Sequence, residues 1–167
     1  MFIKQRNKLF ELKIPKSLKI VYVHGKGLGV FANKDYSKGD TVLHFKADVV
    51  PHSKASAEAV PIDDKVSLDT KWLVLEAFIN HSCSANMTID VIDFRYIAIK
   101  NIHKNEEITY NYNTTEYDME KSRDAFKCEC DSKQCVGKVK GFKYLTQAYK
   151  LKLKPYLTPF LEKRLNP

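Results

Sequence analysis

The four cysteines are the residues of this chain whose types and spacing point most directly to chemistry. Cys128, Cys130 and Cys135 form a Cys-x-Cys-x4-Cys cluster, and Cys83 lies alone in an earlier polar stretch. Four thiolates complete the closed tetrahedral shell of a structural zinc site. The alternative is free or disulfide-bonded cysteines. No apolar segment follows the charged residues 1–6, so no signal peptide is expected and disulfides are disfavoured. The sequence therefore predicts one structural zinc site held by all four thiols.

The stretch that contains Cys83, residues 78–86, combines an apolar entry with a run of small polar side chains. It places the amide of Asn80, the imidazole of His81 and the thiol of Cys83 on one loop. A lone histidine is more often structural than functional, so no general-base role is assigned to His81. Ser82 is expected to be structural as well.

Two further stretches accompany this loop. Residues 27–29 read Gly-Leu-Gly, a pattern that by itself is typical of any tight turn. Residues 107–112 read Glu-Ile-Thr-Tyr-Asn-Tyr, and a tyrosine on a strand most often belongs to the core or its rim. Neither stretch alone indicates a function.

In chain order, these motifs resemble those of the SET-domain lysine methyltransferases. The matching features are the Gly-x-Gly at 27–29, the Asn-His-Ser-Cys at 80–83, the strand ending in tyrosine at 107–112 and the post-SET cysteine cluster. The resemblance covers about residues 18–137. Each motif is weak evidence, but four in the family's order are specific. The commoner methyltransferase pattern, a Gly-rich turn and a distant acidic residue within a βαβ unit, does not occur in the sequence.

The resemblance implies S-adenosylmethionine as the cofactor. In the family, the glycine turn brings backbone against the cofactor, where a Cβ would obstruct the approach. A basic residue beside the turn meets the cofactor carboxylate, while the Asn side chain and the His backbone of the central loop contact the cofactor. An aromatic residue covers the adenine. The residues assigned to cofactor binding on this basis are Lys26, Gly27, Leu28, Gly29, Phe45, Asn80, His81 and Phe126.

Tyr112 and Tyr110 occupy the positions of the family's catalytic tyrosines. Methyl transfer needs a neutral amine, whereas a lysine with its ordinary pKa of about 10.4 is protonated at neutral pH. A narrow aromatic channel and the neighbouring sulfonium both lower the lysine pKa. Tyr112 is expected to orient the amine. The hydroxyl of Tyr110 is expected to hold a water beside the lysine nitrogen, which favours monomethylation with some dimethylated product.

Two positions depart from the family pattern. Phe45 stands where the family usually has a tyrosine, so it keeps an aromatic wall but lacks the hydroxyl. Asn111 replaces the common aspartate between the two tyrosines. A SET-fold binding module with little activity is therefore an alternative interpretation. Such a module need not bind S-adenosylmethionine, whereas the enzyme must.

Charge is distributed unevenly along the chain, whose formal net charge is +8. Residues 1–20 carry six Lys or Arg and one Glu, and residues 138–167 carry eight Lys or Arg and one Glu. Residues 21–137 hold fourteen basic and eighteen acidic side chains. The acidic centre suits a lysine-containing protein or peptide substrate, and the basic ends suit contact with a nucleic-acid or chromatin-like polyanion. A zinc-stapled nucleic-acid-binding protein is thus a second alternative. The plainer interpretation of the basic ends is solvated helix faces.

Length and composition fit one domain, with 167 residues of which 44% are apolar. No run approaches the ~20 apolar residues of a membrane span, and an intracellular location, cytoplasmic or nuclear, is expected. Many short strands predict a mainly β (α+β) structure, a SET-type β-clip fold of several small sheets with a zinc-stapled post-SET segment and C-terminal helices. The expected divisions are a lead-in (1–17), a SET domain (18–113), a post-SET zinc segment (124–140) and a C-terminal helical extension (141–167).

Strands are expected over 18–23, 30–32, 41–50, 66–68, 87–92, 94–99 and 108–112. Residues 1–17 are expected to be irregular or partly helical, and 72–79 to form a short helix. A further helix over 114–125 is expected to open at Thr114 or Thr115. Two amphipathic helices are expected near the C-terminus, one presenting Phe142, Leu145 and Tyr149, the other starting at Pro155 and presenting Leu157, Phe160, Leu161 and Leu165.

Overall fold

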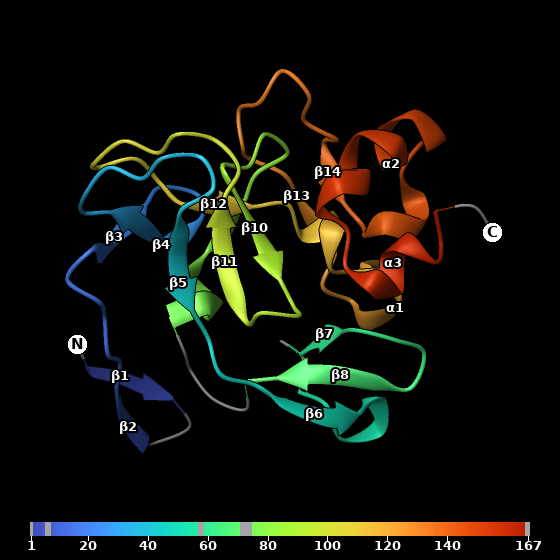
Figure 1. Ribbon diagram of the computed structural model, residues 1–167, viewed down its shortest axis with the longest axis horizontal. Coiled ribbons are helices and arrows are strands. Elements are labelled where there is room, and N and C mark those ends of the chain that lie inside the picture. The colour runs from blue at the N-terminus through green and yellow to red at the C-terminus, as the bar shows by residue number, and fades with distance from the viewer. Residues whose placement is uncertain (1, 6–7, 57–58, 71–74, 166–167) are drawn as a thin grey trace.

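Small, separate β-sheets make up most of the structure (Figure 1). The computed structural model describes the backbone of residues 2–5, 8–56, 59–70 and 75–165, and side chains from residue 12 onward within these ranges. The strands of the described chain are β1 (Phe2–Gln5), β2 (Lys8–Glu11), β3 (Leu18–Val23), β4 (Gly27–Ala32), β5 (Thr41–His44), β6 (Asp48–Pro51), β7 (Val60–Pro61), β8 (Val66–Asp69), β9 (Asn80–His81), β10 (Met87–Asp90), β11 (Arg95–Ala98), β12 (Thr109–Tyr110), β13 (Phe126–Lys127) and β14 (Lys138–Val139). The helices are α1 (Met119–Ser122), α2 (Gln147–Leu153) and α3 (Pro159–Glu162), with 3-10 turns η1 (His52–Lys54), η2 (Leu75–Phe78), η3 (Tyr112–Thr114), η4 (Phe142–Tyr144) and η5 (Lys154–Tyr156). This content confirms the predicted mainly β class.

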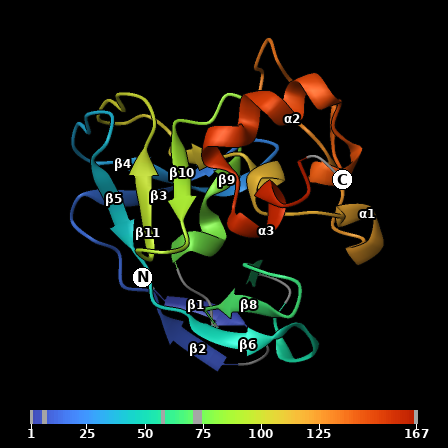
Figure 2. The ribbon, with the colours of Figure 1, turned by 45° about the vertical axis from the view of Figure 1, so that its right-hand side comes forward.

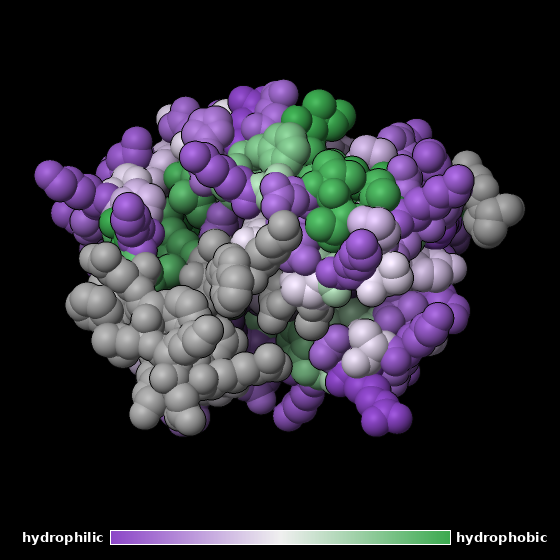
Figure 3. All heavy atoms as spheres, turned by 90° about the horizontal axis from the view of Figure 1, so that it is seen from below, coloured by the Kyte–Doolittle hydropathy of each residue, from purple (hydrophilic) through white to green (hydrophobic). Residues whose placement is uncertain are grey.

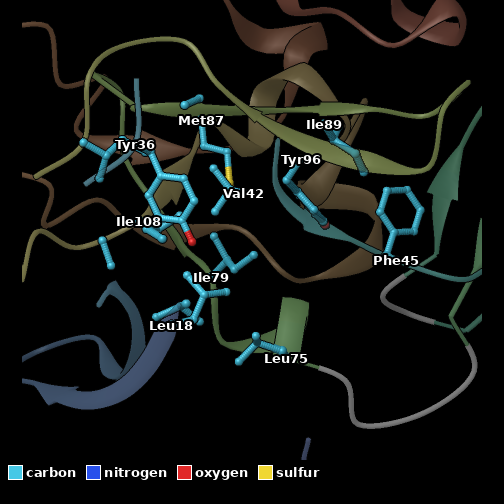
Figure 4. Packing of buried hydrophobic residues seen from close by; sticks show 14 of the residues in the cluster. Leu18, Tyr36, Val42, Phe45, Leu75, Ile79, Met87, Ile89, Tyr96 and Ile108 are labelled. Carbon is cyan, nitrogen blue, oxygen red and sulfur yellow. The ribbon is translucent and has the colours of Figure 1, made fainter. Parts of the chain in front are cut away.

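The central sheet has the order β10-β11-β5 and carries the main hydrophobic core (Figure 4). Along β10 and β11, buried and partly exposed residues alternate, as expected for strands that turn one face to the core. Met87 of β10 and Tyr96 of β11 share one buried cluster with Ile79 and Ile108. Because Ile79 and Ile108 immediately precede β9 and β12, the core fixes the two strands that carry the candidate site.

A short parallel pair joins segments far apart in the sequence. β9 pairs with β12 in the register Thr109 with Asn80 and Tyr110 with His81. The Ser82 N–H extends the pairing by donating to the Tyr110 carbonyl over 3.1 Å. The antiparallel hairpin β3-β4 lies beside this pair, tied to it by an isolated bridge between Phe31 and Glu107. The glycine segment, the central loop and the tyrosine strand are thereby brought together.

The C-terminal helices lie on one side of the molecule, away from the β3-β4 hairpin (Figures 1 and 2). They enclose a second buried cluster, formed by Phe142, Phe160, Leu161 and Leu165. The cluster is attached to the segment that follows β12, because the Thr158 N–H donates to the Thr114 carbonyl over 3.1 Å. The extension therefore supports the chain just beyond the tyrosine strand.

Several predicted strands have different boundaries. The strand predicted over 108–112 is β12, Thr109–Tyr110, and Tyr112 begins the 3-10 turn η3 after the cap Asn111. Residues 1–17, predicted to be irregular or partly helical, contain the hairpin β1-β2. Residues 41–50, predicted to be one strand, form β5 and β6 in two different sheets. The strand predicted over 30–32 begins at Gly27, because residues 24–26 make the turn. The Gly-Leu-Gly motif is thus the start of a strand and not the turn itself.

The predicted helix over 114–125 is much shorter. Only Met119–Ser122 is helical, because the Asp118 carboxylate accepts the Lys121 N–H and caps the helix there, in place of Thr114 or Thr115. Of the helix predicted over 72–79, the part at 72–74 lies outside the described residues, and Leu75–Phe78 form the 3-10 turn η2.

The two predicted C-terminal helices are broken into shorter pieces. Phe142 and Tyr149 do not share one helix, because α2 begins only after the cap Thr146, whose hydroxyl accepts the Tyr149 N–H. Pro155 lies in the 3-10 turn η5, and the last helix starts at Pro159, a position where proline is well tolerated.

The face seen in Figure 3 is hydrophilic over most of its rim, with hydrophobic side chains gathered in the upper part of the view. None of the helices in the described ranges has the length and apolarity that a bilayer crossing requires.

Candidate active site and metal centre

Glu107 organises the entrance of the candidate site. Its carboxylate accepts from the Lys26 ammonium over 2.9 Å through one oxygen and from the Asn80 amide over 2.8 Å through the other. The Asn80 amide also donates to the Leu28 carbonyl over 3.3 Å. A Cβ added to Gly29 would lie 2.9 Å from both Asn80 Nδ2 and Glu107 Oε1, so a larger residue here would displace these two groups. The glycine motif therefore serves this network of side chains.

A pocket of about 240 Å³ opens beside this network. Its lining combines the β3-β4 turn, the central loop, the tyrosine strand and the segment of the clustered cysteines: Gly25, Lys26, Asn80, His81, Tyr112, Phe126, Lys127, Cys128 and Glu129. Of the residues assigned to cofactor binding, Lys26, Asn80, His81 and Phe126 line this pocket. The structure thus gathers residues more than a hundred positions apart around one cavity.

The imidazole of His81 is buried between the loop and the tyrosine strand. Its Nδ1 accepts the Tyr112 backbone N–H over 3.1 Å, so the proton of the neutral ring lies on Nε2, 3.3 Å from Cys83 Sγ. Burial, together with the nearby positive charge of Lys26, lowers the pKa of His81 to about 4. His81 is therefore neutral at pH 7 and connects Tyr112 with Cys83, a structural role that agrees with the absence of an assigned general base.

The Tyr112 hydroxyl donates to the Ile79 carbonyl over 2.8 Å. Burial, with added repulsion from Glu116 and Glu107, raises the pKa of Tyr112 to about 12, which keeps the hydroxyl protonated at neutral pH. Burial likewise raises the pKa of Tyr110 well above its ordinary value. The two rings lie 4.8 Å apart between centroids. They form a weakly hydrated aromatic surface with neutral hydroxyls.

Phe45 lies away from the pocket. Its side chain is buried in the core, with ring centroids 5.7 Å from Phe94 and 5.4 Å from Tyr96, as Figure 4 shows for Tyr96. Tyr96 in turn lies 6.1 Å from Tyr110. Phe45 is therefore connected to Tyr110 indirectly, through Tyr96. Phe45 was predicted to contact the cofactor, but the structure does not place it against the pocket.

The four cysteines converge on one point. Their sulfur atoms all lie within 4.8 Å of one another, and none forms a disulfide. Cys83 Sγ and Cys128 Sγ are 3.9 Å apart. Tetrahedral zinc with Zn–S bonds of about 2.3 Å requires sulfur separations of roughly 3.8 Å, so the set fits this ion. The Val136 N–H directed at Cys83 Sγ over 3.5 Å is the kind of outer hydrogen bond that holds a thiolate ligand.

Burial makes the thiols of Cys83 and Cys128 poor acids without a bound cation. It raises the pKa of Cys83 to about 11 and also raises that of Cys128. Zn²⁺ would stabilise the thiolate forms and release the protons. Tetrathiolate coordination would join the central loop to the segment that carries Phe126, so the metal would serve the adjacent pocket structurally.

The sequence did not single out four residues that the structure brings to the site. Glu107 was noted only as the first residue of the motif at 107–112. Thr115 and Glu116 come three and four residues after the motif and lie beside the tyrosines. The Tyr149 hydroxyl donates to the Cys83 carbonyl over 3.3 Å, a contact that no local pattern could have indicated.

Comparison with known proteins identifies one family. A family model described as the SET domain matches residues 27–113. The histone H3 lysine-36-specific histone-lysine N-methyltransferase of Saccharomyces cerevisiae is 25% identical over 156 residues, which cover 81% of this chain and 21% of that protein. A putative histone-lysine N-methyltransferase of Arabidopsis thaliana, ASHH4, is 24% identical over 153 residues, covering 80% of this chain and 42% of its own length. The chain thus spans about a fifth of the yeast relative.

Solved structures agree on the fold. The crystal structure of KRYPTONITE in complex with mCHG DNA and SAH has a TM-score of 0.58 at 21% identity, and the match covers 72% of this chain and 28% of that one. KRYPTONITE in complex with mCHH DNA, H3(1–15) peptide and SAH has a TM-score of 0.57 at 20% identity, with 72% and 29% covered. These likenesses confirm the predicted SET-type fold.

Proposed function

The chain belongs to the SET domain family, and from this premise we propose that it is a protein-lysine methyltransferase that uses S-adenosylmethionine. The observation that carries the proposal is the position of Tyr112, which lines the pocket while its hydroxyl is held at 2.8 Å by the Ile79 carbonyl. A fixed, neutral hydroxyl beside a cofactor-sized opening is what an in-line transfer to an amine requires.

The pocket residues suit the cofactor chemically. When bound, S-adenosylmethionine supplies an activated methyl group on a positively charged sulfur. The Lys26 ammonium has three N–H donors and gives one to Glu107, so others are free to meet a carboxylate. The Asn80 amide and the His81 backbone offer polar contacts, and the Phe126 ring offers a flat apolar face for the adenine. We assign these four residues to cofactor binding, with Gly29 giving the close backbone approach.

The tyrosines suit the second reactant. A lysine side chain that lies against Tyr110 and Tyr112 exchanges water for aromatic surface, which lowers the pKa of its ammonium. The hydroxyl of Tyr112 then orients the neutral amine toward the methyl group. Positioning of two reactants is a large source of rate acceleration, so no strong base need touch the amine.

We also propose that the bound metal is one structural Zn²⁺ held by Cys83, Cys128, Cys130 and Cys135, on the basis of their sulfur separations. We propose monomethyllysine as the main product, with some dimethyllysine. Support for the product comes from Tyr110, whose buried ring lies 4.8 Å from that of Tyr112 and whose hydroxyl would hold a water near the amine.

Histone H3 is the first substrate to test, because the yeast relative is named as specific for an H3 lysine and one KRYPTONITE structure contains an H3 peptide. A nuclear location would follow from such a substrate. The basic segments 1–20 and 138–167 are proposed to contact a polyanion such as DNA, a property supported only by their charge.

The deciding experiment combines binding and labelling. Isothermal titration with S-adenosylmethionine should give a one-to-one complex, and incubation with labelled cofactor should methylate recombinant H3 or another protein of a cell lysate on lysine. Binding without any labelling would favour a SET-fold binding module instead. Affinity for unrelated DNA that falls steeply with salt, without cofactor binding, would favour the nucleic-acid-binding alternative.

A further inference from the structure

Glu116 lies four residues beyond Tyr112, and the steps described above do not use it. Its backbone is fixed on both sides: the Glu116 N–H donates to the Tyr112 carbonyl over 2.8 Å, and the Phe142 N–H donates to the Glu116 carbonyl over 2.8 Å. The C-terminal extension therefore holds this residue in place beside the tyrosine strand.

Glu116 is half-buried, and its carboxylate has no compensating cation in the described chain. Its side-chain contact is the Thr115 hydroxyl at 3.4 Å, and no Lys or Arg of the described chain forms an ion pair with it. Burying an unpaired carboxylate costs free energy unless the group takes up a proton. Burial raises the pKa of Glu116 to about 7, the Thr115 hydroxyl partly opposing and the charge of Asp124 adding to the rise. At neutral pH the group can both accept and release a proton.

Thr115 connects this acid with the candidate site. Its hydroxyl lies 3.1 Å from the Tyr112 carbonyl and 3.4 Å from Glu116 Oε1, so its single hydrogen can turn to either oxygen. The same hydroxyl interacts with the side chain of Tyr110. The Thr115 hydroxyl therefore lies next to both the Tyr110 side chain and the Glu116 carboxyl, 3.4 Å from Glu116 Oε1.

We propose that Glu116 receives, through the hydroxyls of Tyr110 and Thr115, the proton that the target lysine must lose before methyl transfer. This inference rests on the proposed function and names the route by which the ammonium becomes an amine. Glu116 acts through Thr115 and does not touch the substrate.

The proton steps balance. The ammonium N–H bond breaks and the nitrogen keeps the electron pair, while one hydrogen moves from the ammonium to Tyr110, one from Tyr110 to Thr115 and one from Thr115 to a Glu116 oxygen. The nitrogen pair then forms the new N–C bond as the C–S bond breaks, and the sulfur takes that bonding pair. Glu116 afterwards returns its proton to solvent, since its pKa lies near neutral pH.

The other ionisable groups around Glu116 are accounted for. Asp124, from the segment after α1, and the hydroxyls of Tyr110 and Tyr112 act on it electrostatically. On η4, which packs against its backbone, the cation is Lys143, and that ammonium pairs with Asp118 over 2.7 Å. Asp124 therefore remains the neighbouring charge that can shift the titration of Glu116.

The test is the pH dependence of methylation by Glu116→Gln, with recombinant H3 or the lysate protein labelled by the wild-type chain as substrate. We expect kcat/KM to fall about 10- to 100-fold at pH 7, within the usual range for proton-transfer catalysis. The loss should shrink to within about threefold near pH 9.5, where more of the lysine arrives neutral. Thr115→Val should behave like Glu116→Gln, while Thr115→Ser should retain most of the activity.

Glu120→Gln is the matched control, because Glu120 is an acid of the same segment that pairs with Lys138 at the surface. It should leave the pH profile unchanged. Circular dichroism and S-adenosylmethionine titration should show that the Glu116 and Thr115 variants remain folded and bind cofactor. A Glu116→Gln loss of equal size at every pH, or no loss, would overturn the inference while leaving the proposed function intact. A wild-type chain that binds cofactor but methylates nothing would overturn both.

Discussion

The backbone N–H of Tyr112 donates to Nδ1 of His81 over 3.1 Å, and this bond is what joins the tyrosine strand to the central loop beyond their short parallel pairing. Because the other imidazole nitrogen lies 3.3 Å from Cys83 Sγ, one neutral ring connects Tyr112, the proposed catalytic residue, with the predicted zinc site. Displacement of the cysteine cluster should therefore change the position of Tyr112, although the cluster and the tyrosine lie on different elements.

Tyr112→Phe should reduce turnover at least ~10²-fold while cofactor affinity stays nearly unchanged. The variant keeps the ring that lines the pocket but loses the hydroxyl that donates to the Ile79 carbonyl. We expect this hydroxyl to act on the amine mainly in the transition state. Steady-state kinetics and isothermal titration measure the two quantities separately. Tyr144→Phe, which removes an exposed tyrosine hydroxyl, is the control. Wild-type turnover in Tyr112→Phe would remove this hydroxyl from the mechanism.

Cys83→Ser should lower zinc content and cofactor binding together. Metal analysis of the wild-type chain, purified without added zinc, should give close to one equivalent. Loss of the Cys83 thiolate breaks the link between the central loop and the segment that carries Phe126, which lines the pocket. Ser82→Ala, at the neighbouring loop position, should retain the metal. Full zinc retention in Cys83→Ser would show that Cys83 is not a ligand.

Tyr110→Phe should shift the product toward higher methylation, while loss of the hydroxyl from the proposed proton route should also lower kcat/KM at pH 7. Removing the hydroxyl frees the volume of the water proposed beside the amine, at a cost of about one hydrogen bond, or 0.5–1.5 kcal/mol. Mass spectrometry of the product lysine under excess cofactor measures the change. The outcome that contradicts this idea is trimethyllysine as the main wild-type product, unchanged in the variant.

The stability of the wild-type chain should fall relative to that of Glu116→Gln as pH rises from 5 to 8. The folded-state pKa of Glu116, about 7, lies above its ordinary value of 4.5, so between these values the folded chain binds the extra proton. Raising the pH through this window therefore removes stability, by on the order of 2 kcal/mol after allowance for partial exposure. Urea unfolding at both pH values, at constant zinc and with Glu120→Gln as control, measures the difference. An equal gap between the two chains at pH 5 and pH 8 would show that the Glu116 pKa is not raised.

Much of the candidate site could be predicted because its residues belong to short sequence motifs. The Asn80-His81 pair, the motif ending in Tyr112 and the cysteine spacing can each be recognised without knowing the fold. The metal ligands could be predicted from the cysteine count, because the chain has only four cysteines and a closed zinc site needs four thiolates. The structure brings those four sulfur atoms together, as the prediction requires.

Tertiary structure decided what the local patterns leave open. Phe45 has the same aromatic character whether it faces a pocket or the core, and only packing against Phe94 and Tyr96 settles its place. The C-terminal helices were predicted to be too long because apolar periodicity does not show where a helix begins. The N-cap Thr146, for example, starts α2 well after Phe142. Glu116 was unremarkable in the sequence because a carboxylate acquires an unusual pKa only from its surroundings, here burial and the nearby charge of Asp124, and those arise from contacts between distant segments.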